Sequence, residues 1–387
     1  MSNAKHGRSS SKKDVQTTTE LTATADKKAE KPHRYSRSVR ITAMVMSGVL
    51  ALVGTLFIAA DIYLWALFGR VNYVGDGENT GMLEITMEEE KEKPKDAVEF
   101  DPSMYNTSSL ADIPVMGNTD DITNILLIGV DGKTFEGRAD TNIIVSINDR
   151  TKTVKLISLM RDVWVTVPGY DWNGDGMDDY AKFNAAFSSG GFNLHSKMIE
   201  QNYRLHIDQY VAVNFSAFPE VIDAMGGIDV TLTGGEAERV PAQGSKITYG
   251  GVGYIPMGTT DGTYHMDGFQ ALQYSRLRYY YADSDFTRTS NQRKVISILL
   301  EKAKTMGIGD LNSVLFEALG VVSTNMSPSE FMAFSANALS YRNYSIDTSY
   351  RVPQDGAWLS SWIGSGVGLE LIDPAQSVHE LHEWIYA

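Results

Sequence analysis

Arginine and aspartate are concentrated in one short segment of this sequence. Four of the twelve arginines beyond residue 69 lie within 18 residues of one another, together with two aspartates. These residues are Arg276, Arg278, Asp283, Asp285, Arg288 and Arg293. Guanidinium groups match phosphate oxygens because their N–H donors lie in one rigid plane. Carboxylates would repel a phosphate unless they orient the arginines or hold a bridging metal ion. The segment therefore predicts a polyphosphate site, with a solvated network of ion pairs as the alternative.

The spacing within this segment supports an anion site. Arg276 and Arg278 are two apart on a segment that we expect to be extended, so their side chains project from one face. Arg288 and Gln292 are four apart at the start of an expected helix and also share a face. A helix N-terminus adds free N–H groups and a positive dipole, which favour a bound anion.

Further carboxylates and cations follow other expected strands. Asp131 ends a continuous apolar run, and Arg138 and Asp140 lie on the next loop. Asp131 and Asp140 together could hold Mg²⁺, which prefers one or two carboxylates plus phosphate oxygens; a capping aspartate and a turn aspartate are the alternative. Arg161 closes the third strand, and Lys182 is either a phosphate contact or a surface lysine.

The charge of the chain is divided unevenly. Residues 1–40 carry ten Lys and Arg against four Asp and Glu, whereas residues 41–387 carry 24 against 44, a net charge of −20. The chain has no cysteine, which excludes disulfides, zinc–thiolate sites and thiol nucleophiles. Residues 1–40 have too little apolar content to fold alone, so we expect a disordered basic tail.

An apolar segment separates the two regions. Residues 41–60 contain no charge, and twenty residues rising about 1.5 Å each span a bilayer core of about 30 Å. Residues 41–68 are therefore predicted to be a transmembrane anchor, with Tyr63 and Trp65 at the far interface. A cleaved signal peptide is the alternative, because Ala59–Ala60 resembles a cleavage site. Basic residues before the anchor place the N-terminus in the cytoplasm and the acidic remainder outside the cell.

The remainder of the sequence is typical of an acidic stalk followed by one α/β domain. Residues 69–121 include a charge run and are predicted to be a linker, and residues 122–387 form the folded domain. Apolar runs predict strands, and helical spacing predicts helices, the last with Thr287 or Ser290 as its N-cap. The expected strands are 124–130, 141–147, 153–159, 210–215, 228–232 and 368–372, and the expected helices are 192–203, 218–225 and 290–304. Strands and helices without strict alternation indicate a mixed central sheet flanked by helices.

Seven sequence blocks in this domain match one family. The stretch from about residue 123 to residue 304 resembles the LytR-CpsA-Psr proteins, membrane-anchored ligases of cell-wall glycopolymers in Gram-positive bacteria. The blocks are Asn124–Asp131, Arg138–Thr141, Ser158–Asp162, Lys182–Ala186, Asp223–Val230, Asp267–Arg278 and Asp283–Arg293. Their order behind a single expected anchor makes the resemblance specific.

The resemblance implies an Mg²⁺-dependent phosphotransferase, in which Mn²⁺ could replace Mg²⁺. It would move a glycopolymer, such as teichoic acid or capsule, from undecaprenyl pyrophosphate to peptidoglycan, at the C6 hydroxyl of N-acetylmuramic acid. Asp131 and Asp140 would hold the metal, Asp285 would orient arginines, and a buried apolar slot would take the prenyl chain. Arg276 and Arg278 would act with these three carboxylates in catalysis. The pyrophosphate would be held by Arg138, Arg161, Lys182, Arg276, Arg278, Arg288 and Gln292.

Two rival functions use the same site. A hydrolase would split the lipid pyrophosphate with water as acceptor, and a non-enzymatic attenuator would only bind polyprenyl phosphates. A nucleic-acid partner is not expected, because the cytoplasmic part is only about forty residues without a fold.

The chain departs from the family pattern at three places. Asn291 stands before Gln292 where the family usually has arginine, and Met160-Arg-Asp-Val163 replaces the usual Pro-Arg-Asp-Thr. An insertion before Lys182 has the oxygen-ligand spacing of a calcium loop but lacks the glutamate at position 12, so structural Ca²⁺ and a metal-free turn both remain open. The expected ligands are Asp171, Asn173, Asp175 and Asp179.

Overall fold

The computed structural model describes most of the chain beyond residue 109. The described residues are 46–47, 55, 66, 69, 72–73, 98–100, and 110–387 without 133–134, 172–173, 246, 279, 282–284, 328–329, 331–339 and 364–365. The chain divides into two units, residues 1–60 and residues 61–387, and the second unit contains the folded domain.

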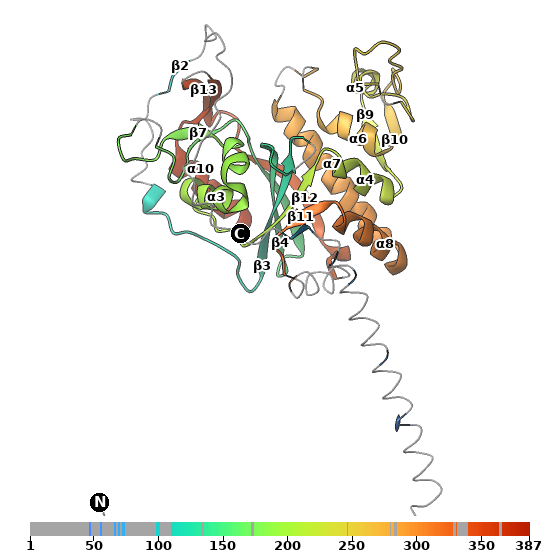
Figure 1. Cartoon of the computed structure of the whole chain (residues 1–387), viewed down its shortest axis with the longest axis horizontal. Coiled ribbons are helices and arrows are strands. Elements are labelled where there is room, and N and C mark those ends of the chain that lie inside the picture. Colours follow the sequence, from blue (N-terminus) through green and yellow to red (C-terminus); the bar gives the residue numbers. More distant parts are fainter. Residues whose placement is uncertain are drawn as a thin grey trace, which may run out of the picture. The chain divides into compact units, whose positions relative to one another are not determined.

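A seven-stranded mixed sheet forms the centre of this unit (Figure 1). Its order is β1-β11-β8-β3-β4-β5-β12. β3, β4 and β5 form an antiparallel meander, while β8 and β12 run parallel to β3 and β5 on its two sides. The strands are β1 (Asn72–Tyr73), β3 (Ile122–Val130), β4 (Ala139–Asn148), β5 (Thr153–Leu159), β8 (Gln209–Asn214), β11 (Val322–Thr324) and β12 (Ser345–Val352).

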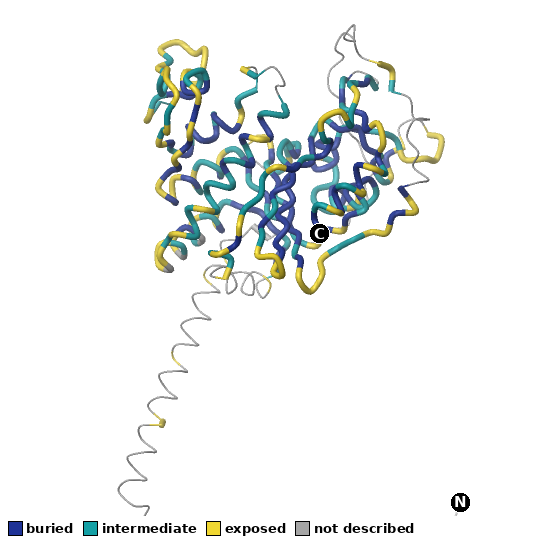
Figure 2. Tube along the Cα trace, turned by 180° about the vertical axis from the view of Figure 1, so that it is seen from behind, coloured by how far each residue is buried: buried dark blue, intermediate teal, exposed yellow. Residues whose placement is uncertain are grey.

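The two faces of the sheet are both covered by helices. Side chains alternate along a strand, so Leu126 and Ile128 enter the core on one face while Leu127 turns to the other. Helices α3 (Ala185–Tyr203) and α10 (Pro374–Tyr386) cover the first face. Buried residues accordingly concentrate along the sheet and on the inner sides of its helices (Figure 2).

The second face is covered by four helices, which enclose a cavity above the sheet. They are α4 (Ala217–Ala224), α6 (Gly268–Ser275), α7 (Asp285–Thr305) and α8 (Ile308–Leu319). Helix α6 begins with a capping box, in which Asp267 accepts from the backbone of Gln270 and the Gln270 side chain accepts from the backbone of Asp267. It is joined to α4 where the Gly268 N–H donates to Asp223 Oδ1 at 2.7 Å. These contacts fix α6, at whose C-terminal end Arg276 lies.

Smaller elements extend the domain beyond the sheet. A small lobe contains the antiparallel pair of β9 and β10 with α5, and its apolar residues, such as Val230 and Leu232, form one core with residues of α4, α6 and α7. The remaining strands form one three-stranded and one two-stranded sheet. The bounds are β2 (Val98–Glu99), β6 (Trp164–Thr166), β7 (Tyr180–Lys182), β9 (Ile228–Leu232), α5 (Gly234–Arg239), β10 (Gly262–Met266), η2 (Ser340–Asn343), β13 (Trp358–Ile363) and β14 (Gly366–Leu371).

The mixed α/β architecture predicted from the sequence is confirmed, and two local predictions are wrong. Helix α7 begins at Asp285, so Thr287 and Ser290 lie inside it and neither is its N-cap. Arg276 is the C-terminal cap of α6 and does not begin an extended segment. Helix α6 itself was not predicted. The two arginines still reach one cavity, because the chain turns after α6.

The predicted anchor, residues 41–68, lies almost entirely outside the described residues, as does most of the stalk. Within the part of the chain that the structure describes, no helix is both long and apolar enough to cross a membrane.

Candidate active site

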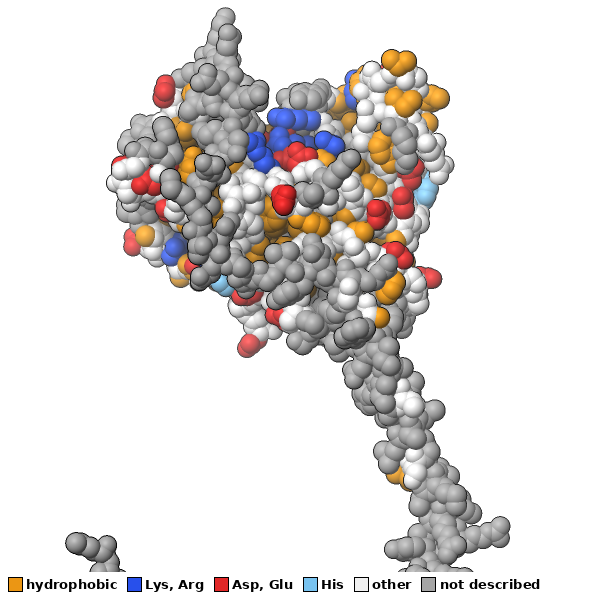
Figure 3. All heavy atoms as spheres, in the orientation of Figure 1, with side chains coloured by type: hydrophobic (Ala, Val, Ile, Leu, Met, Phe, Trp, Pro, Cys, Tyr) orange, Lys and Arg blue, Asp and Glu red, His pale blue; other side chains and the backbone are white. Residues whose placement is uncertain are grey.

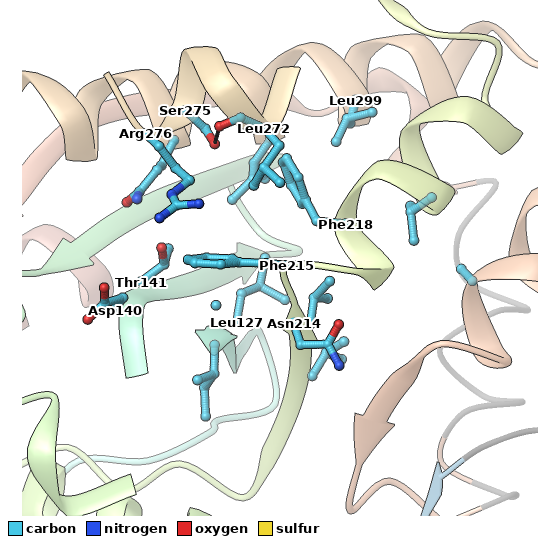
Figure 4. A pocket seen from close by; sticks show the side chains of 18 of the residues that line it. Leu127, Asp140, Thr141, Asn214, Phe215, Phe218, Leu272, Ser275, Arg276 and Leu299 are labelled. Carbon is cyan, nitrogen blue, oxygen red and sulfur yellow. Dashed lines mark hydrogen bonds between the residues drawn. The ribbon is translucent and has the colours of Figure 1, made fainter. Parts of the chain in front are cut away.

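A cavity of about 560 Å³ lies between the second face of the sheet and its four helices. Its floor includes Leu127 of β3 and Val213 of β8, and its walls come from α4, α6, α7 and α8 (Figure 4). Most of the lining side chains are apolar. The apolar side chains of the lining are Leu127, Ile128, Val211, Val213, Phe215, Phe218, Val221, Met225, Leu272, Ile296, Leu299, Leu300, Ala303, Leu311, Val314 and Ala318. Such a cavity suits a hydrocarbon group.

Charged side chains line the same cavity. They come from different elements: the end of α6, the turn after it, the first turns of α7, and the sheet. Arg276 lies with its guanidinium 4.2 Å from the centre of the Phe215 ring, where the apolar and polar linings meet (Figure 4). Lys, Arg, Asp and Glu side chains gather in a hollow of the surface (Figure 3). The charged residues of the lining are Asp140, Arg161, Arg276, Arg278 and Arg288.

Asp285 joins three of the cations. Its Oδ1 lies 2.6 Å from Arg278 Nε, and its Oδ2 lies 3.1 Å from Arg288 Nη2 and 3.4 Å from Arg161 Nε. The side chains of Asp285 and Arg288 are only 13% and 8% exposed, so solvent screens these interactions weakly. Since like charges repel, the position of one carboxylate among three guanidinium groups fixes where each can lie.

A β-bulge connects this cluster to the sheet. Gly129 pairs with Thr141 and Val130 with Ala139, so Asp140 is the extra residue of β4. Its Oδ2 accepts from Arg161 Nη1 at 2.6 Å, and its Oδ1 accepts from Asn184 Nδ2 at 3.1 Å. The bulge thereby places a carboxylate of the sheet against an arginine of the cluster.

A second carboxylate, Asp162, completes the network around Arg161. Its Oδ2 lies 3.2 Å from Arg161 Nε, and its Oδ1 lies 3.5 Å from Lys182 Nζ. Sequence reasoning assigned no role to Asp162 or Asn184, although both lie in the matching blocks next to predicted cations. Their proximity in sequence to Arg161 and Lys182 was the one available signal.

The network shifts the pKa values of its two neighbouring carboxylates, Asp162 and Asp285, in opposite directions. Burial raises the pKa of Asp162, but the charge of Arg161 and a hydrogen bond with Asp285 oppose this effect and hold that pKa well below its usual range. Burial and the hydrogen bond with Asp162 raise the pKa of Asp285. Burial lowers the pKa of Arg161, but Asp162, Asp140 and Asp285 together raise it above its usual value. Arg161 therefore stays charged.

Cations exceed carboxylates at this end of the cavity. Five cationic side chains meet three carboxylates, which leaves an excess of two positive charges. The groups are Arg161, Lys182, Arg276, Arg278 and Arg288 against Asp140, Asp162 and Asp285. Two buried polar atoms beside them, Arg288 Nε and Gln292 Oε1, have no hydrogen-bond partner among the described residues. Because burying a polar atom without a partner is costly, these atoms indicate a ligand.

Other predicted site residues lie at the edge of this arrangement. Asp131 is exposed directly after β3, and its N–H donates to the carbonyl of Arg138 at 2.9 Å. The Asp140 N–H donates to the same carbonyl at 3.0 Å. Lys182 lies at the end of β7, with its Nζ 5.9 Å from the centre of the Trp164 ring. Neither Asp131, Arg138 nor Lys182 lines the cavity.

Asn291 and Arg293 face away from the cavity. Asn291 is buried, accepting from the Tyr274 hydroxyl at 3.0 Å and donating to the Tyr281 hydroxyl at 3.1 Å. Arg293 donates to Ser158 Oγ and to the carbonyl of Thr348, both at 2.7 Å. Burial and the nearby charge of Arg351 lower its pKa to about 10. Arg293 therefore does not replace the arginine that the family usually has at position 291.

The predicted calcium loop is only partly described, because Asn173 lies outside the described residues. Both oxygens of Asp171 accept backbone N–H groups, from Gly174, Asp175 and Gly176. The Asp175 carboxylate accepts from Met177 N–H, and the Asp179 N–H donates to the Tyr170 carbonyl. No group of three or more potential His, Cys, Asp or Glu ligands is found in the described part of the chain. Calcium binding stays a prediction.

Comparison with known proteins gives consistent matches. The sequence model of the LytR_cpsA_psr family matches residues 75–369. The chain is 33% identical over 257 residues to the polyisoprenyl-teichoic acid–peptidoglycan teichoic acid transferase TagU of Enterococcus faecalis, covering 65% of this chain and 74% of that protein. It is also 33% identical over 192 residues to the transferase of the same description, TagT, of Bacillus subtilis, covering 48% of this chain and 54% of TagT.

Solved structures share the fold. Protein gbs0355 from Streptococcus agalactiae superposes with a TM-score of 0.56 at 25% identity, covering 68% of this chain and 86% of that one. A structure of TagT bound to LIIa-WTA superposes with a TM-score of 0.53 at 24% identity, covering 69% of this chain and 90% of that one.

Replacing Asp285 tests whether one carboxylate holds the cluster together. Asp285→Asn should lower the free energy of unfolding by about 2 kcal/mol, because three partly buried arginines lose their shared counter-charge. Inorganic pyrophosphate should then raise the melting temperature of this variant more than that of the unchanged protein. The matched control is Asp355→Asn, whose carboxylate is 95% exposed and should contribute little. Equal melting temperatures for Asp285→Asn and the unchanged protein would contradict this account.

Proposed function

Because the chain belongs to the LytR_cpsA_psr family, we propose that it transfers a glycopolymer from a polyprenyl diphosphate carrier to peptidoglycan. The observation that carries the proposal is the joining of an apolar cavity to a cluster of cations with an excess of positive charge. A polyprenyl diphosphate has the complementary form, a long hydrocarbon chain that ends in a polyanion. The names of TagU and TagT, transferases of polyisoprenyl-linked teichoic acid, support the same interpretation.

The proposed reaction is a phosphoryl-type transfer. A hydroxyl of the acceptor, the C6 hydroxyl of N-acetylmuramic acid, forms a bond to the phosphorus that carries the polymer. The bond from that phosphorus to the bridging oxygen of the carrier phosphate breaks, the carrier leaves as polyprenyl phosphate, and the hydroxyl proton passes to this phosphate or to water. Such reactions depend mainly on positioning and on neutralising charge at the phosphate oxygens, both of which arginines provide.

Within that proposal, the residues of the site have distinct roles. Arg161, Arg276, Arg278 and Arg288 bind the diphosphate oxygens, and the side-chain amide N–H of Gln292 donates to them. Asp285 is a positioning residue that fixes the arginines. Arg138 and Lys182 contribute charge from the rim.

Asp131 and Asp140 are the proposed ligands of Mg²⁺, for which Mn²⁺ could substitute. The donor set fits, because two carboxylates at one edge of the sheet are hard oxygen ligands and Mg²⁺ takes its remaining ligands from water and phosphate. Each Asp140 oxygen accepts one protein hydrogen bond, which leaves a further lone pair. A bound Mg²⁺ would neutralise charge on the diphosphate.

The activity is tested with lipid-linked polymer and peptidoglycan fragments as substrates. The unchanged protein should form polymer–peptidoglycan conjugate, and Arg276→Ala with Arg278→Ala should reduce the rate at least about a hundredfold. Arg150→Ala, in an exposed turn, is the matched control and should keep the full rate. Release of free polymer without conjugate would establish a hydrolase instead. Binding of the lipid without turnover would establish an attenuator.

In the same assay a chelator should stop transfer, and added Mg²⁺ should restore it. Transfer that is unchanged in the presence of the chelator would contradict the proposed role of the metal.

Filling the cavity should separate tail binding from phosphate binding. Leu127→Trp places a large ring on the cavity floor, so affinity for a long-chain polyprenyl phosphate should fall about tenfold or more. Affinity for a geranyl phosphate, whose short chain leaves room, should change little. Leu359→Trp, at an exposed position of β13, is the control. An equal loss for long and short chains would contradict the assignment of the cavity to the tail.

We also propose that residues 41–68 anchor the chain in the cell membrane as a single span, with the N-terminus cytoplasmic and the catalytic domain extracellular. The uncharged run of residues 41–60 and the basic residues before it support this proposal. Protease added to wall-stripped intact cells should then digest the domain and leave a tag at residue 1 protected. Protection of the domain, or release of the whole chain into the medium, would contradict it.

A further inference from the structure

The small lobe presents a stack of aromatic rings around one arginine. The Arg239 guanidinium lies 4.3 Å from the centre of the Tyr280 ring and 5.1 Å from that of Tyr249. Tyr254 packs edge-on against Tyr249, with ring centres 5.4 Å apart. Tyr249 and Tyr280 are nevertheless 52% and 38% exposed. Two rings are thus held in defined orientations while much of their surface stays open to solvent.

Contacts on several sides hold this stack in place. The hydroxyl end of the Tyr280 ring packs against Gly235, so a larger residue at position 235 would displace the ring. Arg239 Nη1 donates to the Gly235 carbonyl at 2.9 Å, which fixes the guanidinium over the same turn of α5. The Tyr254 hydroxyl donates to the Glu238 carbonyl at 2.8 Å.

A buried network ties the same segment to α7. The Tyr281 hydroxyl donates to Glu236 Oε1 at 2.5 Å and accepts from Asn291 Nδ2 at 3.1 Å. Asn291 is one of the three places at which the sequence departs from the expected family pattern. In this chain that position holds the segment carrying Tyr280 and adds no charge to the cavity. Asn291 therefore helps to fix the position of the exposed Tyr280 ring through its hydrogen bond with the neighbouring Tyr281.

The stack lies next to the cationic end of the cavity. Tyr280 is two residues beyond Arg278, and two residues of chain span at most about 7 Å. The hollow that contains the charged side chains has exposed hydrophobic side chains beside it, on the lobe that carries α5 and β10 (Figure 3). If the prenyl carrier leaves into the cavity, the attacking hydroxyl must come from the opposite, open side, because the two oxygens lie roughly in line in such transfers.

We propose that Tyr249, Arg239 and Tyr280 form a binding surface for the glycan chain of peptidoglycan, the acceptor in the proposed function on which this inference rests. The apolar faces of pyranose rings stack on exposed aromatic rings because the contact removes apolar surface of both from water. The tyrosine hydroxyls and the outer N–H groups of Arg239 supply hydrogen bonds to sugar hydroxyls. A ring bound on Tyr280 would place the next sugars of the chain over the arginines.

The charge of the lobe favours a glycan, whose sugar rings carry no charge of their own, over a polymer or bilayer that carries a phosphate in every unit. Residues 228–267 contain five Asp and Glu against two Lys and Arg, a net charge of −3. Such a surface offers no excess of positive charge to attract a bilayer of anionic lipids or a polymer joined by phosphodiesters. If this loop bound a membrane, the fully exposed side chain of Val252 would be the one that inserts into it.

Binding to purified sacculi stripped of secondary polymers, and to soluble glycan strands of N-acetylglucosamine and N-acetylmuramic acid, tests the proposal without any transfer reaction. Tyr249→Ala and Tyr280→Ala should each weaken binding about fivefold or more, and the corresponding phenylalanine variants, which keep the ring, should retain most of it. Affinity for polyprenyl phosphate should be unchanged in all four variants. The melting temperature of each variant shows whether it has lost its fold. Because Tyr249 is half exposed, its replacement should leave the fold intact.

Val252→Asp is the matched control in the same loop. It should bind glycan strands as the unchanged protein does, and no variant should change binding to vesicles of anionic phospholipid. Glycan binding that is equal in Tyr249→Ala, Tyr280→Ala and the unchanged protein would overturn the proposal, as would a loss confined to vesicles or to the lipid-linked polymer. Because glycan strands are measured directly, failure of transfer would refute the proposed function and leave this result standing on its own.

Discussion

Three guanidinium groups converge on one carboxylate at the cationic end of an apolar cavity, and the rest of the site depends on that contact. Arg278 follows α6, Arg288 belongs to α7, and Arg161 follows β5, so Asp285 joins three separate parts of the fold. Without it, the arginines would repel one another and turn toward solvent. With it, they stay close enough to act on one polyanion. Since the carboxylates only partly balance the cations, the cluster holds its shape and still attracts an anion.

The sheet contributes to this cluster through an irregularity in its pairing. In a regular ladder Asp140 would pair with a residue of β3. The bulge between β3 and β4 leaves it without a pairing partner in β3, and its side chain accepts a hydrogen bond from Arg161. Asp162 and Asn184 extend the network to β7 and α3. The cavity then lies between this polar edge and the apolar inner sides of four helices. The same helices thus place an apolar lining and a cationic lining side by side.

The sequence predicted the elements that have one dominant local signal. The central strands are continuous apolar runs because both faces are covered, and the family blocks located most of the cations. Helix α6 was missed, since eight residues with a mixed apolar pattern give a weak signal. The start of α7 was misplaced because polar residues fill its first turns. Asp162 and Asn291 could not be understood from sequence, because their partners Asp285 and Tyr274 lie 123 and 17 positions away. Contacts of that kind follow from tertiary packing.

In the proposed function, the cavity and its arginines together hold a polyprenyl phosphate or diphosphate. Native mass spectrometry of the full chain, released from its own membranes in mild detergent, tests this most directly. We expect one polyprenyl (di)phosphate per chain, which is lost when Arg276 and Arg278 are both replaced by alanine. A chain that carries no lipid, or one that carries ordinary phospholipid equally well with and without these arginines, would contradict it.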